Sequence, residues 1–163
     1  MGLWEDELAR CTAEFPKISV KQFGSDWFSR LVKVISPGTT GLTLWNTVYI
    51  DSGEFGNDRG AETLSHEAIH VGDQHRWNVL FFLSYWILPV GPSLKAIWEW
   101  RGYRENLRWI HDHPLGNDPA YNQYIQDYYC QWVASEFCGT MYLWMWPFKN
   151  VMYKKAKDFI ANL

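Results

Sequence analysis

The segment LSHEAIHVGDQHR, residues 64–76, contains three of the five histidines of this 163-residue chain. Apolar side chains lie among its polar and charged ones, namely Leu64, Ala68, Ile69 and Val71. We therefore expect much of this segment to be a buried helix, where a polar group without a partner costs free energy. The need to partner these groups inside the protein restricts the possible folds more than any other feature of the sequence.

Within this segment, His66, Glu67 and His70 match the pattern H-E-x-x-H. Four residues turn an α-helix by about 400°, so the two histidines lie about 40° apart on one face and can reach one ion. Glu67 is offset from both, where it can take a proton from a water molecule that a zinc ion has made acidic. A chance match on a solvated helix is the alternative, but the apolar neighbours favour a metal site.

Two histidines do not complete a zinc site, so a third ligand is required. His75 follows His66 by nine residues and points about 180° away on an unbroken helix, so it could join only if the helix ended at Gly72. The metzincin pattern requires glycine and histidine where this chain has Asp73 and Arg76. His75 is therefore expected at the surface or beside the ligands.

Two glutamates on a later predicted helix, Glu99 and Glu105, are the other candidates. The stretch WEWRGYREN places Gly102, a small residue that close helix packing would need, and Tyr103 within one turn of Glu99. Trp109 stands four residues after Glu105 and is less able to orient a histidine. These neighbours favour Glu99, and Glu105 remains the alternative.

Hydrophobic periodicity predicts a small sheet followed by helices, an α+β arrangement in a single domain over residues 1–163. Strands are expected within 17–23 and, most clearly, at Leu42–Asp51, which is rich in β-branched and aromatic residues. Helices are expected over 3–14, 25–36, from about 61 through the H-E-x-x-H pattern, 93 to about 110, 120–146 and 148–163.

The order of strand, HEAIH helix, apolar segment and glutamate helix, over about Leu42 to Arg108, resembles zincin metallopeptidases of the gluzincin type. The resemblance is strongest to small single-domain members encoded in phage and bacterial genomes. It implies a zincin-like fold, with a small and mostly antiparallel sheet packed on helices and a helix-rich C-terminal half. It also implies that the strand at 42–51 is a sheet edge that could receive an extended peptide.

The resemblance further implies hydrolysis of a peptide or protein substrate, with Glu67 as general base. The cofactor would be one catalytic Zn²⁺, and its ligands would be His66, His70 and Glu99.

Tyr103 departs from the family pattern, because many relatives have an aspartate there that holds a ligand histidine. Asp73, Asp51 or a backbone carbonyl could take that role, since a metal-bound imidazole usually donates its other N–H. Tyr103 could instead hydrogen-bond Glu99 or water. Zincins also use a histidine, tyrosine or arginine to stabilise the oxyanion, and Tyr103 and His111 are the catalytic candidates. For His111, the alternative is capping of a helix C-terminus.

Charge and cysteine content exclude several classes of partner. The net charge of −3, with scattered Lys and Arg, provides no basic surface for a phosphate backbone, so nucleic acid is not expected. Three cysteines at no metal-like spacing, and acids where a secretory signal has lysines, predict a cytoplasmic location.

The apolar run from Trp77 to Val90 is the one segment that suggests a membrane. As a helix it would span about 21 Å, short of the roughly 30 Å hydrocarbon core. The run could still contact a membrane surface without crossing it. The alternative function is therefore a non-catalytic protein that binds a protein or membrane surface through this run, with a structural or vestigial metal site.

Overall fold

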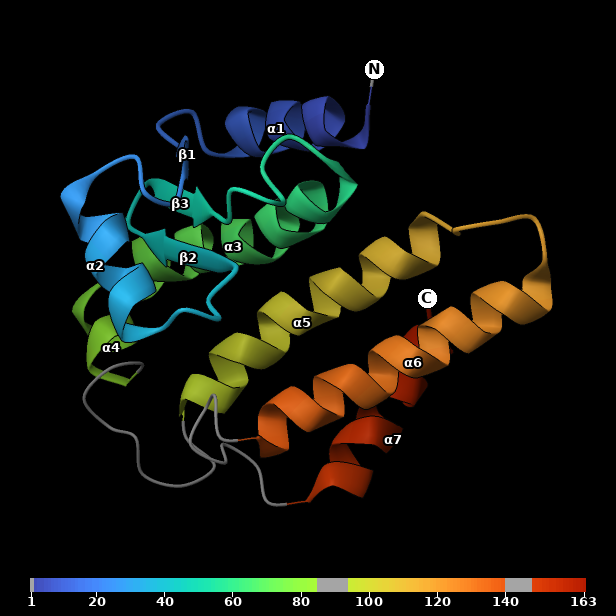
Figure 1. Cartoon of the computed structure of the whole chain (residues 1–163). Helices are drawn as coiled ribbons and strands as arrows, with labels where there is room; N and C mark the ends of the chain where they lie inside the picture. The colour runs from blue at the N-terminus through green and yellow to red at the C-terminus, as the bar shows by residue number, and fades with distance from the viewer. Residues whose placement is uncertain (1, 85–93, 140–147) are drawn as a thin grey trace. The chain divides into compact units, whose positions relative to one another are not determined.

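The computed structural model describes residues 2–84, 94–139 and 148–163 of the chain. These residues form seven helices and one three-stranded sheet, so the predicted α+β class is confirmed (Figure 1). The chain folds as two compact units, Met1–Asn78 and Val79–Leu163. The single domain expected from the chain length stays a prediction.

The first unit contains the sheet and the helix with the H-E-x-x-H pattern. Its elements are α1 (Leu3–Glu14), β1 (Ser19–Gln22), α2 (Trp27–Ile35), β2 (Gly41–Leu44), β3 (Thr47–Ile50) and α3 (Asp58–Trp77). α3 packs against α1 and against strands β2 and β3 (Figure 1). It begins three residues before the predicted start, because the Asn57 side chain caps it by accepting a hydrogen bond from the Gly60 N–H.

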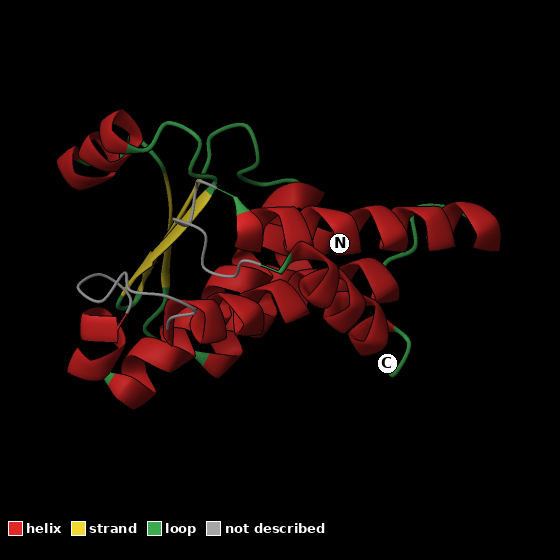
Figure 2. Ribbon diagram, turned by 90° about the horizontal axis from the view of Figure 1, so that it is seen from below, coloured by secondary structure: helices red, strands yellow, loops and turns green. Residues whose placement is uncertain are grey.

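The sheet, drawn in yellow in Figure 2, has the strand order β1-β3-β2. β1 pairs with β3 in parallel, with Val20 opposite Val48, whereas β2 pairs with β3 antiparallel, with Thr43 opposite Val48. The expected mostly antiparallel sheet is therefore wrong, and the sheet is mixed. The reason is that α2 lies in the connection between β1 and β2, and such a crossover allows β1 to run in the direction of β3.

The single strand predicted at Leu42–Asp51 is a hairpin, in which β2 and β3 are joined at Trp45 and Asn46. Trp45 has a φ of 53°, in the left-handed region that two-residue hairpin turns require. Glycine or asparagine usually supplies this conformation, and a tryptophan there gives no turn signal. The periodicity alone therefore reads as one uninterrupted strand.

The second unit is helical and comprises α4 (Val79–Phe82), α5 (Leu94–Asp112), α6 (Pro119–Cys138) and α7 (Lys149–Ile160). α6 packs against both α5 and α7. The buried core of this unit is made of Ala96, Tyr103, Leu107, Cys130, Val133, Ala134, Phe137, Met152 and Ala156. The predicted continuation of α6 to Trp146 lies outside the described residues.

An ion pair and a hydrogen bond join α6 to α7 at one aspartate. Asp127 accepts hydrogen bonds from Lys157 Nζ and from the Tyr153 hydroxyl, both at 2.7 Å. These donors, with Lys157 the stronger, lower the pKa of Asp127 to about 2. The polar contact joins the two helices in addition to the apolar core.

The apolar run predicted from Trp77 to Val90 is described as far as Ser84, and residues 85–90 lie outside the described part. Val79 and Leu80 are about three-fifths exposed, whereas Phe81 is buried. Among the helices built from described residues, none combines the length and apolar character needed to cross a membrane.

Candidate metal centre

His66 and His70 lie one turn apart on α3, and both side chains are buried. Their ring centroids are 5.1 Å apart and their planes are inclined by 71°. This arrangement follows from the four-residue spacing, which returns a helix to nearly the same face. The two imidazoles are thus neighbours, as the sequence predicts.

Glu99, on α5, is the third residue of a buried set that could hold a metal ion. One ring nitrogen from each histidine and one carboxylate oxygen of Glu99 all lie within 4.8 Å of one another, and all three residues are buried. Together they could hold a metal ion. Of the three candidates for a third ligand, Glu99 is the one that the structure groups with His66 and His70.

The donor set suits a divalent transition metal, since imidazole and carboxylate are common ligands for such ions. Tetrahedral bonds of about 2.1 Å would separate the donors by roughly 3.4 Å. Three protein donors would leave a tetrahedral ion one position for water or substrate.

The charge of Glu99 affects the pKa values of two ionisable neighbours in the second unit. Burial lowers the pKa of Lys95, one turn before Glu99, and the Glu99 carboxylate opposes that shift. On α6, burial raises the pKa of Glu136, and repulsion by Glu99 adds to the increase, against a hydrogen bond from Trp132. The Glu99 carboxylate thus has both a cation and a second acid near it.

The two other ligand candidates are engaged elsewhere. Glu105 accepts hydrogen bonds from Arg108 Nη1 at 2.5 and 2.7 Å, one turn along α5. α3 continues through Gly72 to Trp77, so His75 keeps the opposite face that an unbroken helix gives it. It is exposed and lies 2.6 Å from the Asn46 side-chain oxygen, at the hairpin turn.

Glu67, the predicted base, is buried, and a residue of the sheet binds its carboxylate. The Thr43 hydroxyl on β2 donates a hydrogen bond to Glu67 Oε2 at 2.7 Å and lies 3.0 Å from the Glu67 backbone oxygen. Gly41, two residues earlier on β2, lies against the same carboxylate. Sequence reasoning missed both residues, because threonine is an ordinary strand residue and glycine before a predicted strand reads as a turn.

Gln74, also on α3, binds the hairpin that carries Thr43. Its Nε2 donates to the Thr43 carbonyl at 3.0 Å, and its Oε1 accepts from the Trp45 N–H at 2.5 Å. Gln74 is 1% exposed, so water does not compete for these bonds. The helix therefore holds β2 at Thr43 and the following turn at Trp45.

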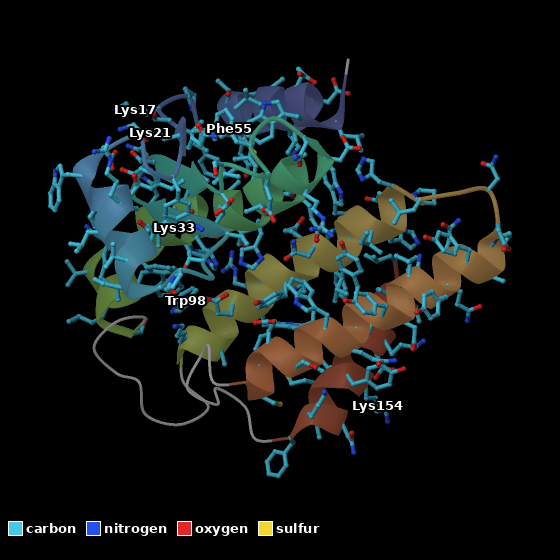
Figure 3. All side chains as sticks on the ribbon, viewed as in Figure 1. Lys17, Lys21, Lys33, Phe55, Trp98 and Lys154 are labelled. Carbon is cyan, nitrogen blue, oxygen red and sulfur yellow. The ribbon has the colours of Figure 1, made fainter. Side chains whose placement is uncertain are left out.

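The two aspartates proposed to orient a ligand histidine have different surroundings. Asp73 is 1% exposed, and its Oδ2 lies 3.9 Å from His70 Nδ1. Asp51 instead forms an ion pair with Lys33 on α2, labelled in Figure 3. This pair lowers the pKa of Asp51, and a hydrogen bond from the Gly53 N–H adds to the shift. Asp73 is thus the aspartate beside a ligand candidate.

The two further catalytic candidates lie at different distances along α5. Tyr103 is one turn after Glu99, is 3% exposed, and packs its ring against Trp132 and Phe137 in the core of the second unit. His111 is twelve residues after Glu99, about 18 Å further along the helix. Its Nδ1 lies 2.9 Å from Asp112 Oδ1 at the helix C-terminus. The structure therefore keeps Tyr103 near Glu99 and does not bring His111 to it.

Comparison of the chain with protein-family models, with curated proteins and with solved structures found no match.

Proposed function

We propose that this chain is a zinc-dependent peptidase in which His66, His70 and Glu99 hold the ion and Glu67 is the general base. The observation that carries the proposal is a set of three buried residues that could hold an ion, with the buried carboxylate of Glu67 next to His66 on α3. Two imidazoles and one carboxylate are a ligand set of catalytic zinc sites. The resemblance of HEAIH and the later glutamate to the gluzincin pattern supports the same assignment.

When bound, zinc would lower the pKa of a water molecule to about 7 and polarise a substrate carbonyl. Glu67 would accept the proton of that water and pass it to the leaving amine. The proton would reside on Glu67 Oε1, because Oε2 accepts the hydrogen bond from Thr43. Burial of Glu67 keeps bulk water from competing for this transfer.

The sheet supports a peptide substrate. β2 pairs with β3 along one side only, so it is an edge strand of the described sheet. Edge strands offer N–H and C=O groups to which an extended peptide can add, although Gln74 already binds the Thr43 carbonyl and the Trp45 N–H on this edge, so addition would involve the part of β2 before Thr43. The side chain of Thr43 on this strand reaches Glu67, so the edge lies beside the proposed base.

Elemental analysis and peptide hydrolysis test the proposal together. We expect about one zinc per chain and cleavage of an unstructured peptide mixture that stops when zinc is removed by chelation. Glu67→Gln keeps the ligands, so it should retain zinc while hydrolysis falls by roughly 10²- to 10⁴-fold.

Glu62→Gln, on the preceding part of α3, is the matched control and should cleave at the parent rate. Parent-like cleavage by Glu67→Gln would contradict the proposal, as would a parent protein that takes up no zinc.

A second candidate function rests on exposed apolar side chains. Val79 and Leu80 on α4 are 61% and 62% exposed, which is unusual for such residues and fits the binding surface expected of the run from Trp77. In this alternative the chain is a non-catalytic binding protein. Co-sedimentation with phospholipid vesicles that persists in the presence of a chelator would favour it over the peptidase.

A further inference from the structure

We propose that Thr43 is a positioning residue for Glu67, one that holds one carboxylate oxygen so that the other is presented for proton transfer. This inference rests on the proposed function of Glu67 as general base and deepens it. It is carried by contacts within the first unit, between strand β2 and helix α3.

The Thr43 hydroxyl has a single proton and two oxygen neighbours. Glu67 Oε2 is 2.7 Å away and the Glu67 carbonyl oxygen is 3.0 Å away. A hydroxyl donates its proton preferentially to a charged oxygen, where the bond is shorter and stronger. Both side chains are about 8% exposed, so solvent offers little competition. The contact is therefore a charge-assisted hydrogen bond that restrains rotation of the carboxylate.

Gly41 explains why the carboxylate fits against the strand. A Cβ at this position would lie 2.6 Å from Glu67 Oε1 and 2.7 Å from Thr63 Cγ2, closer than real Cβ contacts allow. Residues two apart in a strand face the same side of the sheet. Positions 41 and 43 therefore act on the same carboxylate, the first by leaving space beside Oε1 and the second by binding Oε2.

The strand that provides these contacts is itself attached to α3. Gln74 follows Glu67 by seven residues, which is nearly two full helical turns, so both side chains lie on the sheet-facing side of α3. Gln74 binds the Thr43 carbonyl and the Trp45 N–H at 3.0 and 2.5 Å. The Thr43 hydroxyl is thus held at a set distance from Glu67 by bonds that do not involve the carboxylate.

A restrained base lowers the entropy lost on reaching the reactive geometry, so Thr43 should affect the chemical step more than substrate binding. Thr43→Val has nearly the same shape and lacks the hydroxyl, whereas Thr43→Ser keeps the hydroxyl and lacks the methyl group. We expect Thr43→Val to lower kcat by roughly 10- to 100-fold. Its KM, bound zinc and thermal unfolding midpoint should stay close to those of the parent. Thr43→Ser should retain most of the parent kcat.

Parent-like kcat in Thr43→Val would overturn the inference. Equal losses in Thr43→Val and Thr43→Ser would also overturn it, because the methyl group rather than the hydroxyl would then be responsible. If Thr43→Val does not fold, Thr43→Ala provides the test, because it also removes the hydroxyl. Its kcat should fall with zinc retained, and an unchanged kcat would overturn the inference.

The parent protein separates this inference from the function on which it rests. A parent that binds no zinc or cleaves no peptide would refute the proposed function and the role of Thr43 with it. An active parent whose Thr43→Val variant is equally active would refute the role of Thr43 alone.

Discussion

His70 and Asp73 lie one turn apart on α3, with His70 Nδ1 3.9 Å from Asp73 Oδ2 and both side chains almost fully buried. The distance exceeds that of a hydrogen bond. A rotation of either side chain would bring the Asp73 carboxylate within hydrogen-bond distance of His70 Nδ1. Such carboxylates orient ligand histidines and raise their basicity, so we expect Asp73 to take this role when His70 binds an ion.

Asp73→Asn should therefore weaken zinc binding by about 10- to 100-fold, because the neutral amide supports a ligand histidine less well. Competition with a chromophoric chelator measures the dissociation constant directly. Asp51→Asn is the matched control, since Asp51 pairs with Lys33 and should leave zinc affinity unchanged. Equal affinities in the parent and Asp73→Asn would remove Asp73 from the site.

Glu99→Gln should reduce bound zinc from about one per chain to a small fraction, because an amide oxygen is a poor substitute for an anionic ligand. Glu105→Gln, six residues along the same helix, should bind zinc as the parent does because its partner is Arg108. His75→Ala should also retain zinc. Elemental analysis of the dialysed proteins distinguishes these variants, and zinc loss in Glu105→Gln but not Glu99→Gln would reverse the ligand assignment.

Asp26 should make stability depend on pH in the acid range. A hydrogen bond from the Ser29 N–H, with further bonds from Tyr49 and Lys21, lowers the pKa of Asp26 from 3.8 to about 2. Its ionised form is therefore favoured by folding. The resulting stability is present above pH 3.8 and is lost as the pH falls through about 2.

The variant Asp26→Asn should accordingly be less stable than the parent above about pH 4, and the difference should shrink toward pH 2. Urea unfolding at several pH values measures it. A difference that stays constant across this range would show that the charge of Asp26 has no part in it.

Gln74→Met should destabilise the first unit by about 1–3 kcal/mol, because it leaves the Thr43 carbonyl and the Trp45 N–H without the bonds that Gln74 provides. Methionine has a similar length, so the effect of lost volume is small. Gln123→Met, at an exposed position of α6, is the control and should change stability little. Urea unfolding monitored by tryptophan fluorescence compares the three proteins, and equal midpoints would contradict the role of Gln74.

The sequence by itself determined the relation between His66 and His70, because the periodicity of a helix is local and a four-residue step returns to the same face. The same periodicity places His75 on the opposite face of a helix that continues through Gly72. It also located most helices of the described chain, since their apolar spacing and caps are local signals. Asp26, for instance, caps α2, and aspartate is one of the residues that favour this position.

Only the tertiary structure decided which residues far apart in the chain act together. Glu99 and Glu105 lie on one helix, and only the structure shows that Glu99 is almost fully buried whereas Glu105 is bound by Arg108. The turn at Trp45 depends on Gln74, 29 residues later, and the hold of Thr43 on Glu67 spans 24 residues. Hydrogen bonds between distant segments leave no periodic pattern in a sequence, so only the structure shows which residues form them.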